Sequence, residues 1–125
     1  MSGLVQAEVR RLFAMGVKPS QIALIGPRAL TRGSLSRVTA IDGTPLSSDA
    51  AAWRSGGGVL VTTARAFKGL EADVVVLYDL QGFGERFTRT DLYVAWTRAK
   101  HRLIAICHGA EVRAEIEAAL AEPSK

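Results

Sequence analysis

The sequence predicts a single α/β domain of three layers, in which helices cover both faces of a mostly parallel sheet. The expected strands are apolar along their whole length, which is typical of strands buried on both faces. Segments with the apolar spacing of helices separate these strands. The chain has 125 residues, 48% of them hydrophobic, which is enough for a normal core without disulfides or a structural metal.

The first half of the chain begins with apolar residues at the spacing of one helix face and continues through turn residues into a short apolar run. Between that run and the glycine-rich stretch at 55–58, helix, strand and turn signals overlap. The expected elements are a helix over 3–15 that ends near Gly16, a strand over 21–25, a helix over 29–38, a strand over 37–41 and a turn at Asp42-Gly43.

The second half has a clearer pattern, because β-branched and apolar runs alternate with segments of helical spacing. No repeat or linker interrupts it, so residues 1–125 are expected to form one domain. The expected elements are a strand over 59–63, a strand over 73–80, a helix over 89–100, a strand over 101–107 and a helix over 110–120.

Positive charge is concentrated in the middle of the chain. The chain has 16 Lys and Arg against 12 Asp and Glu, a net charge of +4. Between Pro27 and Lys68, the only acidic residues are Asp42 and Asp49, against six basic ones. An anionic partner such as nucleic acid is one explanation of this bias, and a solvated basic face is the other.

The sequence also indicates a compartment. The single cysteine, Cys107, lies in an apolar run without a partner, which indicates a core thiol in a reducing environment. No stretch near the N-terminus reaches the length of a signal peptide or a membrane span, so we expect a cytoplasmic location and no membrane contact. His101 and His108 flank one expected strand without a third ligand, and no metal site is predicted.

In parallel sheets, ligands bind beyond the carboxyl ends of the strands, where the loops leave toward the next helix. The loop after the first expected strand carries Arg28, and the loop after the strand at 59–63 carries Arg65 and Lys68. These positions predict an edge that faces phosphates.

Two stretches resemble motifs of the superfamily 1 DNA helicases of the UvrD, PcrA and Rep type. Their motif V, roughly T-x-H-x-x-K-G-L-E-F, is similar to TTARAFKGLEADVV at 62–75. Their motif VI, L-Y-V-A-x-T-R-A, is similar to LYVAWTRAKHRL at 92–103. The order and the spacing agree, and a weaker likeness in QIALIGPRALTRGSL extends the resemblance to roughly residues 20–108.

The resemblance implies the second RecA-like lobe, called 2A, of an ATP-dependent helicase or translocase acting on single-stranded DNA. ATP with Mg²⁺ lies between two such lobes and is held mainly by the first, in the same or a partner chain. These 125 residues contain no G-x-x-x-x-G-K-[ST] phosphate loop, so the isolated chain is expected not to hydrolyse ATP. A non-enzymatic nucleic-acid or protein-binding module derived from such a lobe is the alternative.

By the same resemblance, the motif residues have expected roles at the nucleotide. Arg98 is the expected arginine finger, with a surface helix arginine as the alternative. Lys68 and Gly69 are expected to approach a phosphate closely, although the pair would otherwise be an ordinary turn. Glu71 is expected to contact the nucleotide sugar.

The resemblance also assigns three residues to single-stranded DNA. Thr63 matches the motif V threonine, and Arg65 replaces a histidine that contacts the strand. Arg28 takes the place of another contacting residue, or is an exposed loop arginine. Members with a large 2B insertion have it between the Arg28-like position and motif V, but here only about thirty residues intervene. The segment 36–49 is therefore expected to form a small loop or hairpin instead.

Two aromatic residues of the 89–100 helix allow two interpretations. Trp96 and Tyr93 could be stacking platforms for bases. Trp96 is expected to belong to the core instead, because with Leu92, Ala95 and Ala99 it falls on the helix face that should pack on the sheet.

Overall fold

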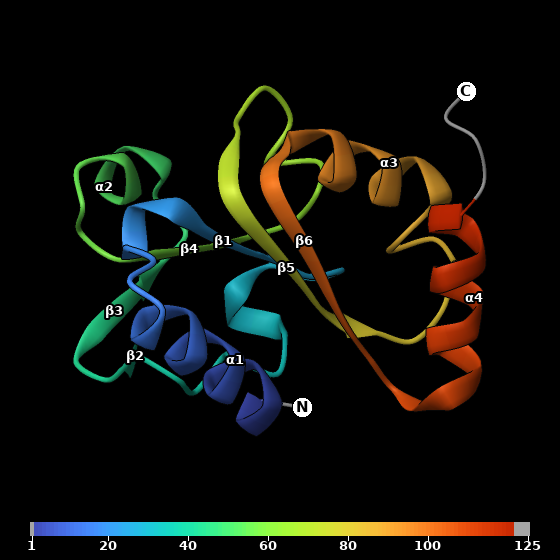
Figure 1. Cartoon of the computed structure of the whole chain (residues 1–125), viewed down its shortest axis with the longest axis horizontal. Helices are drawn as coiled ribbons and strands as arrows, with labels where there is room; N and C mark the ends of the chain where they lie inside the picture. Colours follow the sequence, from blue (N-terminus) through green and yellow to red (C-terminus); the bar gives the residue numbers. More distant parts are fainter. Residues whose placement is uncertain (1, 122–125) are drawn as a thin grey trace.

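The computed structural model describes residues 2–121 (Figure 1). Helices and strands alternate over most of this range. In chain order the elements are α1 (Ser2–Ala14), the 3₁₀ turn η1 (Pro19–Gln21), β1 (Ile22–Ile25), the 3₁₀ turn η2 (Leu30–Arg32), β2 (Ala40–Ile41), β3 (Thr44–Ser47), α2 (Ala50–Arg54), β4 (Val59–Thr62), β5 (Ala72–Leu80), α3 (Arg89–Arg98), β6 (Ala99–Cys107) and α4 (Gly109–Ala121).

The strands of the described range form one six-stranded sheet in the order β2-β3-β4-β1-β5-β6. β2 and β3 pair in antiparallel fashion, and the other neighbouring strands pair in parallel. The prediction of an α/β fold with a mostly parallel sheet is confirmed. Because β4, β1, β5 and β6 run in one direction, their carboxyl ends share one edge of the sheet and their amino ends share the opposite edge.

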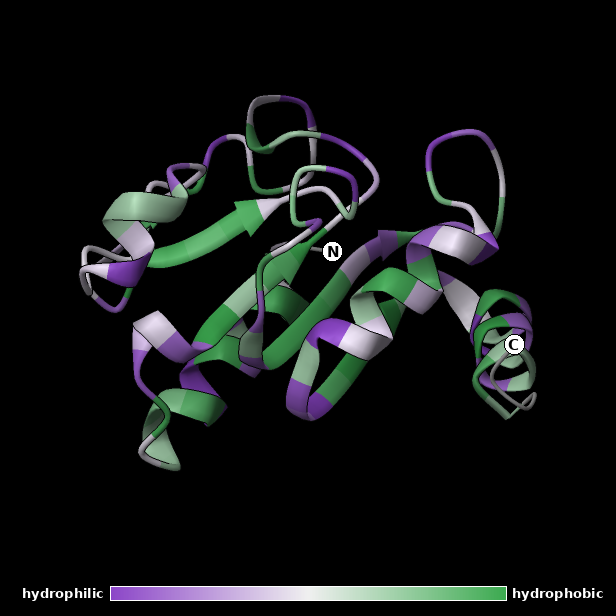
Figure 2. Cartoon of the chain, turned by 90° about the horizontal axis from the view of Figure 1, so that it is seen from above, coloured by the Kyte–Doolittle hydropathy of each residue, from purple (hydrophilic) through white to green (hydrophobic). Residues whose placement is uncertain are grey.

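The two faces of the sheet bury two separate sets of side chains. Along β5, Val74 and Val76 belong to the cluster that α1 covers, whereas Val75 and Leu77 belong to the cluster that α3 and α4 cover. Successive strand residues point to opposite faces, so an apolar strand serves both layers. Figure 2 shows the strands hydrophobic along most of their length and the hydrophilic residues concentrated in loops and helix surfaces. The helices therefore enclose the sheet in three layers.

A reciprocal cap fixes the start of α3. The hydroxyl of Thr88 accepts a hydrogen bond from the Asp91 backbone N–H (3.1 Å), and the Asp91 carboxylate accepts one from the Thr88 N–H (2.9 Å). This capping box satisfies two N–H groups that the helix leaves without internal partners. Arg98 is the last residue of α3, which then runs directly into β6.

The predicted helix over 29–38 is wrong. Only the turn η2 forms, and Gly33 follows it with an extended backbone. The backbone N–H of Ser34 donates to the carboxylate of Asp79 (2.8 Å) instead of to a helical carbonyl. The strand predicted over 37–41 is also too long, because β2 comprises only two residues. The helix is replaced by a tertiary hydrogen bond that local sequence does not reveal.

The turn predicted at Asp42-Gly43 is confirmed. Asp42 and Gly43 have φ values of 50° and 80° and connect β2 to β3, as expected for a two-residue hairpin turn. This hairpin lies inside the segment 36–49, where the sequence predicts a small loop or hairpin. Sequence reasoning missed β3 and α2, whose four and five residues are too few to reveal a period.

The assignment of Trp96 to the core is wrong. Its side chain is 38% exposed, whereas Leu92 and Ala95 are buried as predicted. Asp91, Leu92 and Ala95 form the stripe that faces the sheet, and Trp96 follows Ala95 by about 100° around the helix. The residue therefore lies beside the buried stripe.

None of the helices within residues 2–121 is both long and apolar enough to span a bilayer.

Candidate functional site

Glu71 and Arg98 are neighbours at the amino edge of the sheet. Ala72 of β5 and Ala99 of β6 are register partners in a parallel pair, and Glu71 and Arg98 directly precede them. Adjacent strands lie about 4.8 Å apart, so the two stretches that carry these residues meet side by side. In Figure 1 the turn before β5 and the C-terminal end of α3 both lie at the upper ends of β5 and β6.

Arg98 has an unusual environment for a helix-terminal arginine. The residue is half-buried, and its Nε atom is buried without a hydrogen bond to any residue in the described range. A cation at a helix C-terminus is favoured by the helix dipole, which accounts for its charge being tolerated there. The dipole does not satisfy the Nε donor. Buried donors without partners are rare. The Nε–H of Arg98 can therefore donate a hydrogen bond to a group outside residues 2–121.

A short turn places Lys68 and Gly69 before β5. It is built on Thr63, whose carbonyl accepts from the Phe67 N–H (2.9 Å) and whose hydroxyl accepts from the Ala66 N–H (3.2 Å). Phe67 is fully buried and anchors the turn to the core. Lys68 is exposed, and Gly69 has a φ of +88° with no atom within 4 Å of a Cβ placed there. The positive φ requires glycine, and the open space leaves the backbone accessible.

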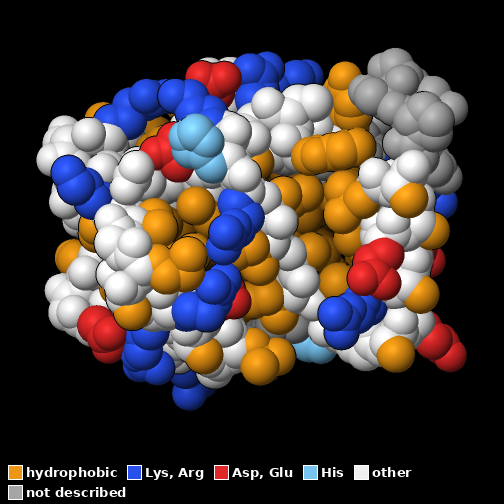
Figure 3. Space-filling view, in the orientation of Figure 1, with side chains coloured by type: hydrophobic (Ala, Val, Ile, Leu, Met, Phe, Trp, Pro, Cys, Tyr) orange, Lys and Arg blue, Asp and Glu red, His pale blue; other side chains and the backbone are white. Residues whose placement is uncertain are grey.

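A small hollow of about 250 Å³ lies at the same amino edge. Its charges are mixed, and Asp73 is already engaged by the amide of Gln21 (2.6 Å) and lies 3.8 Å from His101. Figure 3 shows Lys and Arg side chains along the upper rim of the molecule, above the starts of β5 and β6. The lining residues are Ser20, Trp53, Arg54, Glu71, Ala72, Asp73 and Lys100.

Arg28, Thr63 and Arg65 meet at the opposite, carboxyl edge. They line one pocket of about 800 Å³, although the chain separates Arg28 from the other two by more than thirty residues. Arg65 also donates to the backbone carbonyl of Glu85 (3.3 Å), which ties it to the loop 81–88. The other lining residues are Pro27, Ala29, Arg32, Ala64, Glu85, Arg86 and Asp91.

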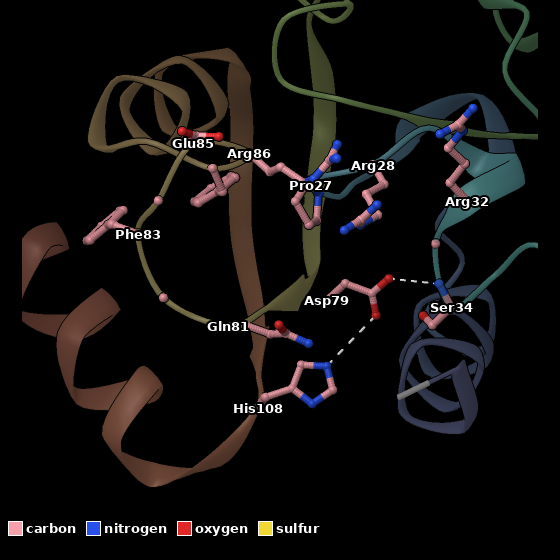
Figure 4. A pocket seen from close by; sticks show the side chains of 14 residues that line it. Pro27, Arg28, Arg32, Ser34, Asp79, Gln81, Phe83, Glu85, Arg86 and His108 are labelled. Carbon is pink, nitrogen blue, oxygen red and sulfur yellow. Dashed lines mark hydrogen bonds and ion pairs between the residues drawn. The ribbon is translucent and has the colours of Figure 1, made fainter.

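A second pocket of about 680 Å³ continues the first along this edge (Figure 4). The two share Pro27, Arg28, Arg32, Glu85 and Arg86, so four arginines lie along one continuous groove. Sequence reasoning counted Arg32 as part of a basic region without assigning it a site, and it missed Arg86 entirely. The signal for Arg86 was its place in the loop after an expected strand, which is where ligands bind.

A close contact between Gly26 and Tyr78 holds the loop that carries Arg28. A Cβ at Gly26 would lie 2.7 Å from Cζ of the Tyr78 ring, so no other residue fits there without a shift. Tyr78 is fully buried. Burial raises the pKa of Tyr78, and the neighbouring charge of Asp79 raises it further. The tyrosine is therefore a neutral support beneath the loop.

The predicted site residues thus divide between two edges of one sheet. Arg28, Thr63 and Arg65 follow β1 and β4. They therefore lie beyond the carboxyl ends of these strands, which is where ligands of parallel sheets bind. Glu71 and Arg98 instead precede β5 and β6 and lie at the amino edge.

No three His, Cys, Asp or Glu side chains within residues 2–121 gather in a way that could hold a metal ion.

Comparison with protein families identifies the segment that contains both signature stretches. Residues 58–106 match the UvrD-like helicase C-terminal domain. This segment includes six of the seven predicted site residues, and only Arg28 lies outside it. A search of curated proteins gave no match. The match agrees with the motif order and with the six-stranded, mostly parallel sheet, and it supports a UvrD-like helicase C-terminal domain over residues 58–106.

Proposed function

We propose that this domain is the second motor lobe of an ATP-dependent DNA helicase or translocase, with a nucleotide at its amino edge and single-stranded DNA at its carboxyl edge. The register pairing of Ala72 with Ala99 carries the proposal. It brings Glu71 and Arg98 together from two stretches that are far apart in the sequence, and both stretches resemble helicase motifs.

Arg98 is the proposed arginine finger. ATP supplies a γ-phosphoryl group whose oxygens carry the charge that must be stabilised during transfer. The guanidinium is a planar, permanently charged fork of donors that suits such oxygens. The buried Nε without a partner supports this role, because it leaves Arg98 with donor capacity for an external anion.

Lys68, Gly69 and Glu71 are the other proposed nucleotide contacts. The exposed Lys68 and the open backbone at Gly69 suit the approach of a phosphate, and the Glu71 carboxylate can accept hydrogen bonds from sugar hydroxyls. These residues form one wall of a cleft. We expect the first lobe, in the same or a partner chain, to hold the phosphates and Mg²⁺, because these 125 residues contain no phosphate loop.

Single-stranded DNA is the proposed ligand of the carboxyl edge. Arg28 and Arg65 offer fixed positive charge along one pocket, and Thr63 contributes a hydroxyl. Such a groove binds a phosphate backbone mainly through charge. The carboxylate of Asp91 lines the same pocket, but it accepts the hydrogen bond that caps α3 and is thereby drawn toward the helix.

The test of this function is the turnover rate of a protein in which this domain is joined to a first lobe carrying a phosphate loop. Arg98→Ala should reduce ATP turnover by about 10³-fold or more, as for fingers in other phosphoryl-transfer enzymes. Its effect on ATP affinity should be much smaller, because the contact strengthens as charge develops.

Arg102→Ala is the matched control, since Arg102 is an exposed arginine four residues later on β6. It should leave turnover near the parental rate. Parental turnover in the Arg98→Ala protein would remove Arg98 from the nucleotide edge and favour a nucleic-acid-binding module without a motor. Thermal melting of both variants would show that neither change unfolds the domain.

A further inference from the structure

The loop 81–88, which connects β5 to α3, is fastened to α4 by a hydrogen bond between distant parts of the chain. The backbone N–H of Phe83 donates to Oε1 of Glu115 at 2.9 Å. Glu115 lies in the middle of α4, thirty-two residues further along the chain. In Figure 1 the loop leaves β5, passes beside α4 and turns back to α3. A charged acceptor makes such a bond stronger than a bond between neutral groups.

Gly82 makes room for this carboxylate. Its φ is +106°, a conformation that residues with a side chain rarely adopt. A Cβ at Gly82 would also lie 3.3 Å from the same Oε1 atom of Glu115. Both the backbone conformation and the space beside it therefore suit glycine, and the carboxylate approaches the loop backbone at this point.

Contacts within the loop and with the start of α3 make the loop a compact unit. The rings of Phe83 and Phe87 stack with centroids 6.3 Å apart and planes 8° apart. The Arg89 guanidinium lies 4.6 Å from the centroid of the Phe83 ring. The Gly84 N–H donates to the carbonyl of Phe87 (2.9 Å), whose side chain is buried. Glu115 therefore fastens a preformed unit to α4.

This unit carries Arg86 to the groove at the carboxyl edge. Arg86 lines both pockets of that edge, and Figure 4 shows its side chain running from the loop toward Arg28. On the groove side, Arg65 donates to the Glu85 carbonyl at 3.3 Å, which is longer than a typical hydrogen bond. The shorter bond to Glu115 holds the other side. A displacement of the loop would withdraw Arg86 from the groove.

We propose that Glu115 is a positioning residue for nucleic-acid binding, because it holds the loop 81–88 where Arg86 meets a phosphate of the strand. The inference rests on the proposed binding of single-stranded DNA at this edge. It predicts an effect of opposite sign to simple electrostatics. A surface carboxylate repels a polyanion, so its removal ordinarily tightens binding. Removal of Glu115 should instead weaken binding, because it frees the loop.

The test titrates the 125-residue chain with a labelled single-stranded oligonucleotide, by fluorescence anisotropy at several salt concentrations. Glu115→Ala removes the acceptor, whereas Glu115→Gln removes the charge and keeps a carbonyl oxygen that can accept from the Phe83 N–H. Glu117→Ala is the matched control, because it removes the same charge from an exposed position of α4 that pairs with Arg113 (3.8 Å). Hydrogen exchange of the Phe83 amide reports on the hydrogen bond itself.

Glu115→Ala should weaken binding at low salt about threefold to fivefold, as for one exposed contact between charges. The slope of log affinity against log salt should become shallower by about 0.7, the share of one phosphate of a single strand. The Phe83 amide should exchange faster. Glu115→Gln and Glu117→Ala should keep that amide protected and bind at least as tightly as the parent. In an Arg86→Ala background, Glu115→Ala should change the affinity little, because the arginine that it positions is gone.

Unchanged or tighter binding by Glu115→Ala would overturn the positioning role and leave the arginine groove standing. Equal protection of the Phe83 amide in the parent and in Glu115→Ala would also overturn it. An equal loss of affinity in the Arg86→Ala background would assign the effect to a general loosening of the domain and overturn it too, even if Glu115→Ala melts at a lower temperature. Absence of binding by the parent would overturn both the groove and the positioning role.

Discussion

The ring of Tyr78 lies directly beneath Gly26, so close that a Cβ would come within 2.7 Å of Cζ and 2.9 Å of a ring carbon beside it. The contact joins the end of β1 to the carboxyl-terminal part of β5 on the face that α1 covers. The tyrosine hydroxyl is buried and makes no hydrogen bond within the described residues. The ring therefore supports the Arg28 loop by packing alone.

Gly26→Ala should destabilise the domain. The added methyl group would force the ring or the loop to move, and overpacking of this kind typically reduces the free energy of unfolding by about 1–3 kcal/mol. Urea unfolding measures the loss. In a Tyr78→Leu background the same change should have a smaller effect, because the clashing ring is gone.

Gly3→Ala is the control for a glycine change as such. Gly3 lies in α1, where an added Cβ would have no atom within 4 Å, and alanine is the better helix former. It should leave stability unchanged or slightly raised. An equal loss in both variants would contradict the role of the Tyr78 contact.

Tyr78→Phe should behave differently at neutral and alkaline pH. Near pH 7 the change should be almost neutral, because the hydroxyl has no partner to lose. The pKa of Tyr78 is raised in the folded protein, so above the ordinary tyrosine value of about 10 the unfolded chain ionises first. The parent should therefore lose stability as pH rises above that value. The phenylalanine variant should lose less, and parallel loss in chemical denaturation would exclude Tyr78 as the cause.

The isolated chain should bind single-stranded DNA weakly, in the range of about 10⁻⁴–10⁻⁶ M that is typical of charge-driven binding. Affinity should fall steeply with salt as counterions are released. Arg65→Ala should weaken binding, because Arg65 lines the groove. Arg113→Ala removes an exposed arginine on α4 that pairs with Glu117 (3.8 Å) and should have little effect. Anisotropy titrations at two salt concentrations test both, and salt-independent binding would count against the groove.

The isolated chain should bind ATP poorly and should not hydrolyse it. One open wall leaves the phosphates in water, where each charged contact is worth a fraction of its value in a closed site. Calorimetry should give a dissociation constant of about 1 mM or weaker, which corresponds to about 4 kcal/mol of binding free energy. A tight, Mg²⁺-dependent site would contradict the half-site, and joining the first lobe should restore both binding and turnover.

Sequence reasoning succeeded where a pattern and a motif coincide. The strands β1, β4, β5 and β6 were predicted because buried parallel strands are apolar throughout. Each motif stretch directly precedes a predicted strand. Because the two strands are adjacent in the sheet, Glu71 and Arg98 lie near each other. Nothing in local sequence gives the register of that pair, since register depends on how whole strands align.

Sequence reasoning failed where long-range contacts decide the structure. The helix expected over 29–38 competes with a hydrogen bond from Ser34 to Asp79, which is forty-five residues away. Trp96 was assigned to the core because its spacing from Leu92 and Ala95 places it near the buried face of α3. Spacing alone does not show how wide the strip of that face is that packs on the sheet. Arg86 was missed because its pocket is closed by loops from two distant parts of the chain.

The segment 63–71 connects the two edges of the sheet, since it leaves β4 at the carboxyl edge and enters β5 at the amino edge. Arg65 lies near one end and Glu71 at the other. Buried Phe67 fastens its middle, and the Leu70 N–H donates to the Phe67 carbonyl (2.9 Å). From Ala72 to Leu77 the sheet spans about 17 Å at 3.3 Å per residue. Under the proposed function, the segment links the nucleotide edge to the DNA edge over that length, so a displacement of Glu71 would be transmitted to Arg65 and to the proposed DNA strand.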